Sequence, residues 1–490
     1  MAISITRRQA LQLRAVMRRA FGNRGPGPAL AFIADAEGLR VRARFADAAV
    51  EYRAPGECPT ETLWLPFPFL ADCEGKKDEP VKLAAADKGR VTAQWRDGSV
   101  PQIISYHAEP PADADKFPGV PETFAENQPR LLQSLTDAGE SCDPDSIRCA
   151  LAFLQLRGQQ GSVVATDARQ LLVQSGFTFP WEEDILIPRS KVFSSSELAG
   201  DHPVLVGKAQ DNVAFRIGPW TIWMIINKDG QFPDLSRHIP QPTDATARCT
   251  LSATDAVFLA QSLPRLPSDD AYNFPVTLDL NGDITIRAKA VDQAKPTEIV
   301  LANSSWSGKP VRLNLNRKFL ARALKLGFYD LLVYGDKVPV VCHDEHRHFV
   351  WATLDPESAI PPAADAIRIE SPSAEPQAPA TQPQTRRRIS PVSEPVSNPS
   401  QDAPSSANGS SNGHARTNGR AKHNGEARRT KASQQDIASL VQQAEALRTS
   451  LRDTQLKTNE LLKGLKAHRR RSRVLQSTIA SLRQLKTLGV

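Results

Sequence analysis

Asp167 is a residue whose type and position could serve chemistry. It lies in the stretch VVATDARQLLV (163–173), in which two β-branched residues lead into a polar turn and an apolar pair follows. The pattern predicts a strand, a tight turn and a second strand. An aspartate in a turn usually accepts hydrogen bonds from its own backbone two residues on. The stretch alone therefore leaves two interpretations open, a catalytic aspartate or a hairpin whose shape matters more than its carboxylate.

The stretch CHDEHRH (342–348) could bind a metal ion, because it holds one cysteine, three histidines and two acidic residues. Its spacing does not match a closed tetrahedral zinc site, and a solvated hairpin tip between two late strands is the favoured interpretation. The stretch GQQGS (158–162) is too short to cradle a phosphate and predicts a turn. No P-loop, G-x-S-x-G or HExxH motif is present. We therefore expect no catalytic residue, no metal and no cofactor, and a protein that is not an enzyme.

Length and composition favour a soluble protein of several domains. With 490 residues, 40% hydrophobic and 23% charged, the chain is long enough for two to four domains. No apolar run approaches the roughly 20 residues of a membrane helix, and the N-terminus lacks the apolar core of a signal peptide. The six cysteines show no CxxC spacing and predict reduced thiols in a cytoplasmic protein.

The positive charge of the chain is concentrated near its C-terminal end. Residues 386–490 contain 20 lysines and arginines against 7 acidic residues, whereas the first 385 residues contain 41 against 47. A mildly acidic body thus carries a basic tail. This asymmetry predicts a polyanionic partner such as nucleic acid, bound partly by the tail.

Three segments of similar length precede the tail, and each combines a helix-like stretch near its start with short β-rich runs. They are expected to form three α+β domains, at residues 1–118, 119–243 and 244–356. The first opens with ITRRQALQLRAVMRRAF, whose apolar residues recur at helical spacing with arginines over the remaining positions. The third opens with SATDAVFLAQSLPRLP, a predicted helix with Ser252 and Asp255 placed to cap it.

Two further features are predicted in the third segment. Asn281 and Gly282 mark the turn of a hairpin. The stretch RKFLARALKLG (317–327) predicts a second helix.

Beyond residue 356 the composition changes abruptly. Residues 357–432 are rich in Pro, Ser, Ala, Asn and Gly and predict a disordered linker. Residues 433–488 predict one long helix with an imperfect heptad pattern, interrupted by polar residues and carrying HRRRSR (468–473). The heptads imply a helical partner, either a second copy or another protein, and the basic runs suggest either solubilising charge or nonspecific DNA contacts.

An ordered set of stretches resembles the bacterial DNA polymerase III beta subunit, the sliding clamp. The set comprises VVATDARQLLV, ILIPRSKVF (185–193), IINKDGQFPDLSRHIP (225–240), PVRLNLNRKFLARALK (310–325) and VPVVCHDEHRHFVW (338–351). The resemblance covers about residues 1–355 and is weak in the first segment. It implies three similar domains, each with two helices backed by antiparallel sheet, and two chains closed head to tail into a ring around duplex DNA.

The resemblance also implies which residues contact DNA. A sliding ring must hold phosphates without reading bases, so scattered cations on inward-facing helices suffice. The expected DNA-binding residues are Arg7, Arg8, Arg14, Arg18, Arg19, Arg24, Arg130, Arg189, Arg265 and Arg322. Lys191, Arg317, Lys318 and Lys325 lie on the same inward elements. For any single residue, a basic solvated helix face is the simpler explanation.

A second implied site is a pocket for a short apolar peptide, between the second and third domains. Matching motif to motif places in it Leu151, Thr166, Ala168, Arg169, Gln170, Leu171, Pro233, Arg237, His238, Tyr272, Asn316, Phe319, Phe349 and Trp351. On this interpretation Asp167 shapes the turn and is not catalytic. The chain departs from the family pattern, since Ala-Arg-Gln replaces Gly-His-Arg in the turn and over 130 residues follow the usual C-terminal end. The pocket is therefore expected either to bind an altered peptide or to be occupied by the tail.

The resulting functional hypothesis is a processivity factor, a homodimeric ring that is loaded by a clamp loader and tethers a replicative DNA polymerase in the cytoplasm, at the nucleoid. The alternative is a scaffold that kept the clamp fold without encircling DNA. It would bind DNA through its basic tail and partners through its coiled coil.

Overall fold

The structure, a computed structural model, describes residues 3–22, 27–107, 109–112, 114–146, 150–235 and 239–373. All of them belong to the first of two compact units, Met1–Pro383. The expected coiled coil and most of the expected linker lie outside the described residues. Among the helices that are described, none has the length and hydrophobicity needed to cross a membrane.

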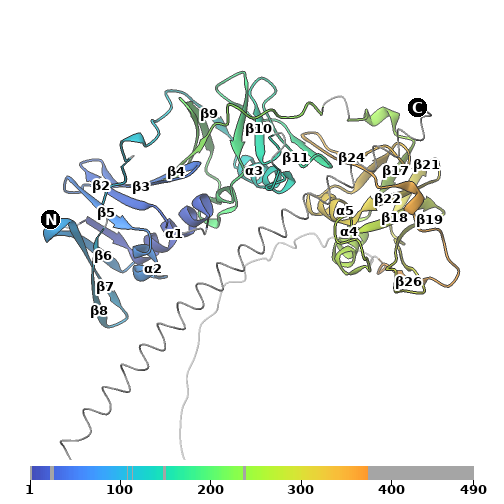
Figure 1. Ribbon diagram of the computed structural model, residues 1–490, viewed down its shortest axis with the longest axis horizontal. Helices are drawn as coiled ribbons and strands as arrows, with labels where there is room; N and C mark the ends of the chain where they lie inside the picture. Colours follow the sequence, from blue (N-terminus) through green and yellow to red (C-terminus); the bar gives the residue numbers. More distant parts are fainter. Residues whose placement is uncertain are drawn as a thin grey trace, which may run out of the picture. The chain divides into compact units, whose positions relative to one another are not determined.

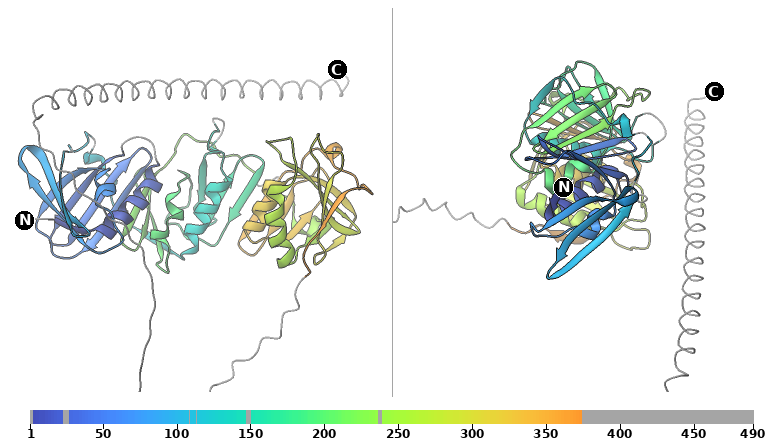
Figure 2. Two further views of the ribbon diagram at one scale, coloured as in Figure 1. Left: turned by 90° about the horizontal axis from the view of Figure 1, so that it is seen from below. Right: turned by 90° about the vertical axis from the view of Figure 1, so that its left-hand side faces the viewer.

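The helices of this unit are few and short. Within the described residues they are α1 (Arg7–Phe21), α2 (Phe69–Cys73), α3 (Arg130–Ser141), α4 (Ala253–Ser262) and α5 (Arg317–Lys325) (Figure 1). In the expected second domain, two 3₁₀ turns, η3 (Val192–Ser194) and η4 (Ser196–Leu198), stand where a second helix was expected. The first and third domains carry the expected helix pairs. Figure 2 shows α4 and α5 next to each other, and the two helices are in contact.

Helix α1 illustrates how the sequence sets these elements. Thr6 and Gln9 form a capping box, in which the side chain of each accepts a hydrogen bond from the backbone N–H of the other. The helix ends at Gly22, whose φ of 78° suits glycine. The predicted apolar face is confirmed, because Ala10, Leu13, Val16 and Met17 are buried. The arginines of the sequence pattern occupy the remaining positions.

Four sheets make up the rest of the unit, and within each the neighbouring strands are antiparallel with one exception. Two sheets lie within single domains. The four-stranded sheet runs β1 (Ile3–Thr6), β6 (Pro80–Ala86), β7 (Arg90–Asp97), β8 (Val100–His107). The five-stranded sheet runs β22 (Val311–Asn316), β18 (Pro275–Asn281), β19 (Asp283–Ala288), β20 (Thr297–Val300), β26 (Ile367–Glu370).

The two larger sheets each join strands of neighbouring domains. The eight-stranded sheet runs β5 (Glu61–Pro66), β2 (Ala29–Asp35), β3 (Gly38–Phe45), β4 (Ala48–Pro55), β16 (Trp220–Ile225), β15 (Asn212–Ile217), β14 (Val204–Ala209), β9 (Phe124–Asn127). The nine-stranded sheet runs β13 (Asp184–Pro188), β10 (Phe153–Arg157), β11 (Ser162–Thr166), β12 (Gln170–Gln174), β25 (Arg347–Trp351), β24 (Val340–His343), β23 (Asp330–Val333), β17 (Ala247–Thr250), β21 (Ser305–Gly308). Pairing of β4 with β16 and of β12 with β25 therefore links the domains through backbone hydrogen bonds.

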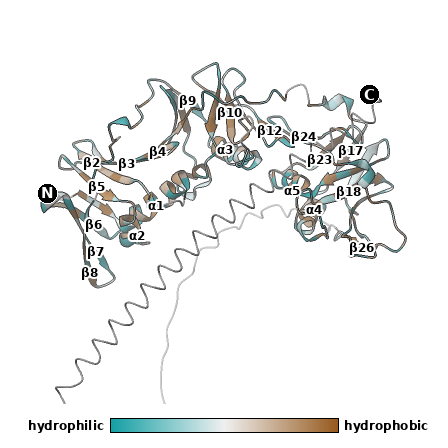
Figure 3. Ribbon diagram, in the orientation of Figure 1, coloured by the Kyte–Doolittle hydropathy of each residue, from teal (hydrophilic) through white to brown (hydrophobic). Residues whose placement is uncertain are grey.

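Apolar side chains of the strands and helices form the core. Hydrophobic residues are concentrated on strands such as β2 and β3 (Figure 3). One large cluster of buried residues extends from Ile3 to Met224 and a second from Leu172 to Trp351. The first cluster thus spans the expected first and second domains, and the second lies in the expected third domain except for Leu172 of β12. The predicted α+β class is confirmed.

Three predicted turns are present. β11 and β12 form the hairpin of VVATDARQLLV, and the GQQGS stretch contains the turn between β10 and β11. β18 and β19 form the hairpin at Gly282, whose φ is 90°. The CHDEHRH stretch contributes the ends of β24 and β25 and the turn between them, where Asp344 accepts hydrogen bonds from the backbone N–H groups of His346 and Arg347.

The folded body continues past the expected start of the linker. Residues 354–372, named here the C-terminal strap, follow β25, form the turn η8 (Pro356–Ser358) and end in β26. β26 pairs with β20 and is parallel to it, the one exception to the antiparallel rule. The sequence did not indicate this strand, because the surrounding composition is that of a linker.

Candidate DNA-facing groove and peptide pocket

The turn at Asp167 is held by its own carboxylate. Oδ1 of Asp167 accepts hydrogen bonds from the backbone N–H groups of Arg169 and Gln170, both at 2.8 Å. Oδ2 accepts a third from the side-chain amide of Gln170, at 3.1 Å. A carboxylate with three donors inside its own turn is occupied in shaping that turn.

Ala168 lies at the tip of this turn in the left-handed region, with φ of 69°. An L-residue with a Cβ pays about 1–2 kcal/mol for that conformation, whereas glycine does not. We therefore expect Ala168→Gly to raise the free energy of unfolding by about 1 kcal/mol, as measured by urea denaturation. Ala165→Gly, in the interior of β11, is the control and should lower it. A destabilising Ala168→Gly would contradict this account of the turn.

Arg169 reaches from the turn to aromatic residues of the third domain. Its guanidinium carbon lies 4.3 Å from the ring centroid of Tyr272 and 5.4 Å from that of Phe319. Its Nη1 is buried and makes no hydrogen bond within the described part of the chain. An unsatisfied charged donor beside two aromatic rings suits a carboxylate or carbonyl oxygen of an incoming ligand.

A small cavity adjoins this turn. It measures about 220 Å³ and lies between strands of the nine-stranded sheet and the chain that links the second and third domains. Its lining residues are Arg157, Val164, Leu171, Val173, Leu235, Ile239, Pro240, Gln241, Pro242 and His348. Of these, the sequence interpretation named only Leu171. The period-two alternation of the two hairpin strands could have indicated Val164 and Val173.

Several expected pocket residues are buried in the core. Thr166 is 1% exposed and its hydroxyl donates to the backbone oxygen of Gln170. Asn316 is 1% exposed and caps α5 by accepting from the backbone N–H of Lys318. Phe349 and Trp351 are fully buried, with ring centroids 5.2 Å apart. These side chains support the pocket region from within.

The remaining expected pocket residues differ in accessibility. Leu151 is buried and Pro233 is half-buried, whereas Tyr272 is 45% exposed. Arg237 and His238 lie outside the described residues. The structure therefore brings together Arg169, Tyr272 and Phe319, whereas Leu171 is the one expected pocket residue among the described residues that line the 220 Å³ cavity.

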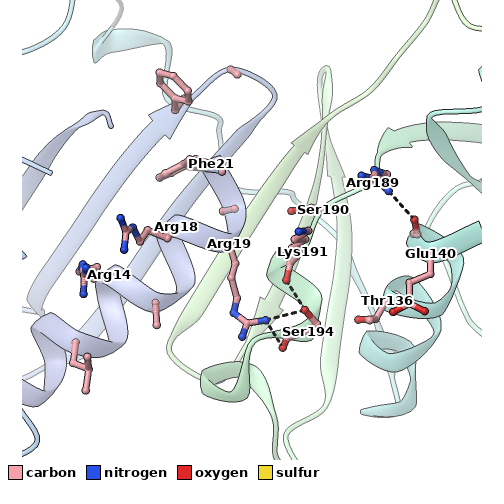
Figure 4. A pocket seen from close by; sticks show the side chains of 17 residues that line it. Arg14, Arg18, Arg19, Phe21, Thr136, Glu140, Arg189, Ser190, Lys191 and Ser194 are labelled. Atoms are coloured by element: carbon pink, nitrogen blue, oxygen red, sulfur yellow. Dashed lines mark hydrogen bonds between the residues drawn. The ribbon is translucent and has the colours of Figure 1, made fainter. Parts of the chain in front are cut away.

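The larger hollow is a groove of about 1180 Å³ between α1 and the segment that contains η3. Figure 4 shows Arg14, Arg18 and Arg19 on α1, with Arg189, Lys191 and Ser194 on the facing segment and Glu140 on α3. Five basic residues and one acidic residue thus line it. Arg19 spans the groove, since its Nη1 donates to the backbone oxygen and the hydroxyl of Ser194, each at 2.9 Å.

Four of these cations have no carboxylate partner within the described part of the chain. Arg18, Arg19, Arg189 and Lys191 are all exposed, and none forms an ion pair with a described residue. Arg189 donates only to the backbone oxygen of Gly139, at 3.4 Å. Unpaired exposed cations concentrated around one groove are available to phosphates.

The other expected cations of α1 are engaged within the protein. Arg14 pairs with Glu74. Arg7 is 13% exposed and pairs with Glu79 at 3.0 Å and with Asp97 at 3.1 Å, which ties α1 to the first domain. Arg8 is 52% exposed and pairs with Asp78 at 3.2 Å.

Arg322 joins α5 to α3. Its Nη1 lies 2.8 Å from Glu140, and its Nη2 donates to the hydroxyl of Ser141 at 3.1 Å. Lys325 also pairs with Glu140, at 3.0 Å. Burial disfavours the charged form of Glu140, but the hydrogen bonds from Lys325 and Arg322 outweigh it and lower the pKa of this carboxyl. The single acid of the groove is thus neutralised by two cations of the third domain.

The remaining expected DNA contacts lie elsewhere. Arg130 donates to the backbone oxygen of Gly176 at 2.9 Å. Arg265, at the end of the turn η7 (Leu263–Arg265), is exposed. Arg317 is buried, and burial lowers its pKa. Lys318 lies 3.8 Å from the ring centroid of Phe274, and burial together with Arg169 and Arg317 lowers its pKa. Arg24 lies outside the described residues.

Four antiparallel-rich sheets with helices against them, two of the sheets shared between neighbouring domains, are the fold of the bacterial DNA sliding clamps. Among solved structures, the chain is similar to the DNA polymerase III subunit beta from Pseudomonas aeruginosa, with 16% sequence identity and a TM-score of 0.61 over 72% of this chain and 100% of that one. It is also similar to the beta subunit from DNA polymerase of Streptococcus pyogenes, with 14% identity and a TM-score of 0.61 over 72% and 100% of the two chains.

A third similar structure is the DNA polymerase III beta chain from Streptococcus pneumoniae, with 17% identity and a TM-score of 0.60 over 72% of this chain and 100% of that one. No protein-family model matches the sequence, and no curated protein matches it. The resemblance noted in the sequence is thus confirmed as a likeness of fold, at a sequence identity of 14% to 17% with these structures.

Proposed function

We propose that the protein is a DNA sliding clamp, a homodimeric ring that encircles duplex DNA and tethers a DNA polymerase. The observation that carries this proposal is the groove with four cations that lack a carboxylate partner among the described residues, Arg18, Arg19, Arg189 and Lys191, in a chain with the clamp fold. Exposed cations without carboxylate partners attract the phosphates of DNA of any base sequence. They contribute no base-specific contact, which is the requirement for sliding.

Encirclement is tested by topology. The protein is loaded with a clamp loader on nicked circular DNA, the circle is then linearised, and the retained protein is measured by gel filtration. We expect retention on circles and release from linear DNA. Equal retention on both forms would reject encirclement, because electrostatic adhesion alone does not depend on the ends of the DNA.

The alternative is a clamp-fold scaffold that binds DNA through the basic tail without encirclement. Removing the tail separates the two proposals, since a clamp body remains dimeric and a scaffold body becomes monomeric. The position of the C-terminal strap determines which residue the deletion should start from. A deletion starting at 358 would remove β26 from the folded body, so the deletion should start at residue 374. Light scattering then gives the mass of the body.

The Arg169 cluster supports a peptide pocket for partner proteins. Because Arg169 places a buried, unsatisfied Nη1 beside Tyr272 and Phe319, we propose that the partner peptide combines apolar residues with one acidic side chain. A charged hydrogen bond of this kind contributes about 1.5–3 kcal/mol. The tail itself contains such acidic and apolar residues and is a possible occupant within the same chain.

The prediction is specific to charge. A leucine-rich pentapeptide with a central Asp should bind about ten times more tightly than its Asn counterpart, by fluorescence anisotropy. In Arg169→Gln this preference should disappear while the Asn peptide binds as before. An unchanged preference in Arg169→Gln would exclude Arg169 as the selecting residue.

A further inference from the structure

The C-terminal strap is fastened to the third domain along its whole length. The backbone N–H of Leu354 donates to the backbone oxygen of Asn314 at 2.7 Å. The N–H of Ile360 donates to the hydroxyl of Thr277 at 2.8 Å. The N–H of Ile367 then donates to the oxygen of Pro296 at 2.9 Å, where β26 begins. The strap thus passes from β22 across β18 to the far edge of the five-stranded sheet.

The end of the strap is anchored by a buried polar network. Ser371 is 6% exposed, and its hydroxyl accepts from the backbone N–H of Ala302 at 3.0 Å. The side-chain amide of Asn303 donates to the oxygen of Pro372 and to the carboxylate of Asp255, each at 2.8 Å. Burial alone would raise the pKa of Asp255, but hydrogen bonds from Ser304, Ser371 and Asn303 lower it. β26 is therefore a permanent strand of the domain.

The four sheets have eight terminal strands, and two of these differ from the others. Within the described residues, large exposed hydrophobic side chains occur on terminal strands only in β8 and β26. They are Val100, Ile103 and Ile104 on β8, with 55%, 64% and 36% exposure, and Ile367 and Ile369 on β26, with 54% and 43%. Proteins normally protect edge strands with charges or by covering them, because an open apolar edge pairs with other chains.

The charges near these two edges do not protect them. On β26, Arg368 pairs with Asp283 at 3.2 Å and with Glu370 at 3.5 Å, so these charges are satisfied within the chain. Ile367 and Ile369, two residues apart on a strand, share one face. β8 reads VPQIISYH and contains no lysine, arginine or acid. Pro101 near its start leaves residues 102–107 free to pair.

We propose that β26, and not β20, is the strand through which the third domain binds a second copy of this chain, and that its partner strand is β8 of that copy. The contact is heterologous, because β8 belongs to the first domain and β26 to the third. Two such contacts close a symmetric dimer. The strap, which lies past the expected end of the third domain, thus supplies the interface itself. This inference rests on the proposed homodimeric ring and adds which strand closes it.

Charge substitutions in the full chain test the surfaces. Ile103→Lys and Ile369→Lys should each raise the dimer dissociation constant about tenfold or more, since each places a charge in a buried apolar contact. The matched control is Val291→Lys. Val291 is also a β-branched apolar residue, but it is 91% exposed and lies on no strand. Analytical ultracentrifugation over a range of concentrations gives the constants. An unchanged constant in Ile369→Lys would overturn the inference.

Cross-linking tests which strands meet. Chains with Ile103→Cys and chains with Ile369→Cys are mixed and oxidised, in a background with Cys58→Ser and Cys149→Ser. The four remaining native cysteines are poor competitors, because burial raises the pKa of Cys73, Cys142 and Cys249 to about 12 and also raises that of Cys342. A disulfide-linked dimer should form only in the mixture. Cross-linking of either variant alone would show pairing of like strands and overturn the heterologous contact.

Weakening the polar network that holds the end of the strap distinguishes two cases. In the first, β26 pairs with the second copy; in the second, β26 only covers β20. Asn303→Ala removes the two hydrogen bonds that the Asn303 side-chain amide donates to the end of the strap, to the backbone oxygen of Pro372 at 2.8 Å and to the hydroxyl of Ser371 at 3.4 Å. If β26 pairs with the second copy, this variant dimerises less well than the wild type. If β26 only covers β20 and must leave before pairing, the variant dimerises better, which would overturn the inference. A wild type that is monomeric at all concentrations would instead contradict the proposed ring.

Discussion

Replacing Arg287 by methionine is expected to lower the free energy of unfolding by about 3–5 kcal/mol. Arg287 on β19 lies 2.6 Å from Asp279 and 2.5 Å from Glu298, and all three side chains are at most 10% exposed. Removing the guanidinium leaves the buried Glu298 without an ion-pair partner among the described residues and leaves Asp279 with only the partly exposed Arg312. The cost arises from that uncompensated charge, since a buried ion pair is destabilising to break even where its net contribution is small.

The control for this prediction is Arg312→Met. Arg312 binds the same oxygen of Asp279 at 3.1 Å but is 35% exposed, so its loss should cost about 1 kcal/mol or less. Urea denaturation of the full chain, monitored by tryptophan fluorescence, gives the free energy of unfolding of both variants. Equal effects of the two substitutions would show that the buried position of Arg287 is not what matters. Because Glu298 lies on β20, Arg287→Met should also increase amide exchange in β26.

Neutralising the groove is expected to produce the largest loss of DNA binding. The fourfold variant Arg18→Ala, Arg19→Ala, Arg189→Ala, Lys191→Ala removes the four exposed cations that lack a carboxylate partner in the described part of the chain. Each lost phosphate contact lowers the slope of log affinity against log salt by about 0.9. The slope should therefore fall by about 3 to 4, as measured by anisotropy with a duplex between 50 and 200 mM salt.

A control of equal charge distinguishes the groove from general attraction. Lys289, Lys295, Lys309 and Lys337 are exposed lysines of the third domain that do not line the groove, and their fourfold replacement by alanine changes the net charge equally. It should leave the slope nearly unchanged. If both variants lose the same slope, DNA binds through overall charge and the groove has no special role.

Local patterns in the sequence determined much of the secondary structure. The strand–turn–strand of VVATDARQLLV, the apolar face of α1 and the cap at Ser252 all appear in the structure. Each depends on residues within a few positions of one another, so their types and spacing are sufficient. The order of the motifs also indicated the clamp fold, which the structural similarity confirms.

Whether a given side chain is exposed, buried or ion-paired could be determined only from the tertiary structure. Arg7 and Arg18 belong to the same basic pattern on one helix, yet Arg7 is bound by two carboxylates far along the chain, Glu79 and Asp97, and Arg18 is exposed. Phe349 and Trp351 were expected at a pocket and lie fully buried in the core. Such outcomes depend on partners far along the chain, which spacing in the sequence does not specify.

The sequence by itself determined the capped helices, the tight hairpins, the α+β class and a surplus of positive charge. Only the tertiary structure decided which cations lack a carboxylate partner among the described residues. It also decided that residues 354–372 add a fifth strand, and with it a new edge, to the sheet of the third domain. The physical reason is that helices and turns depend on neighbours in sequence, whereas ion pairs and strand edges depend on which distant residues folding brings into contact.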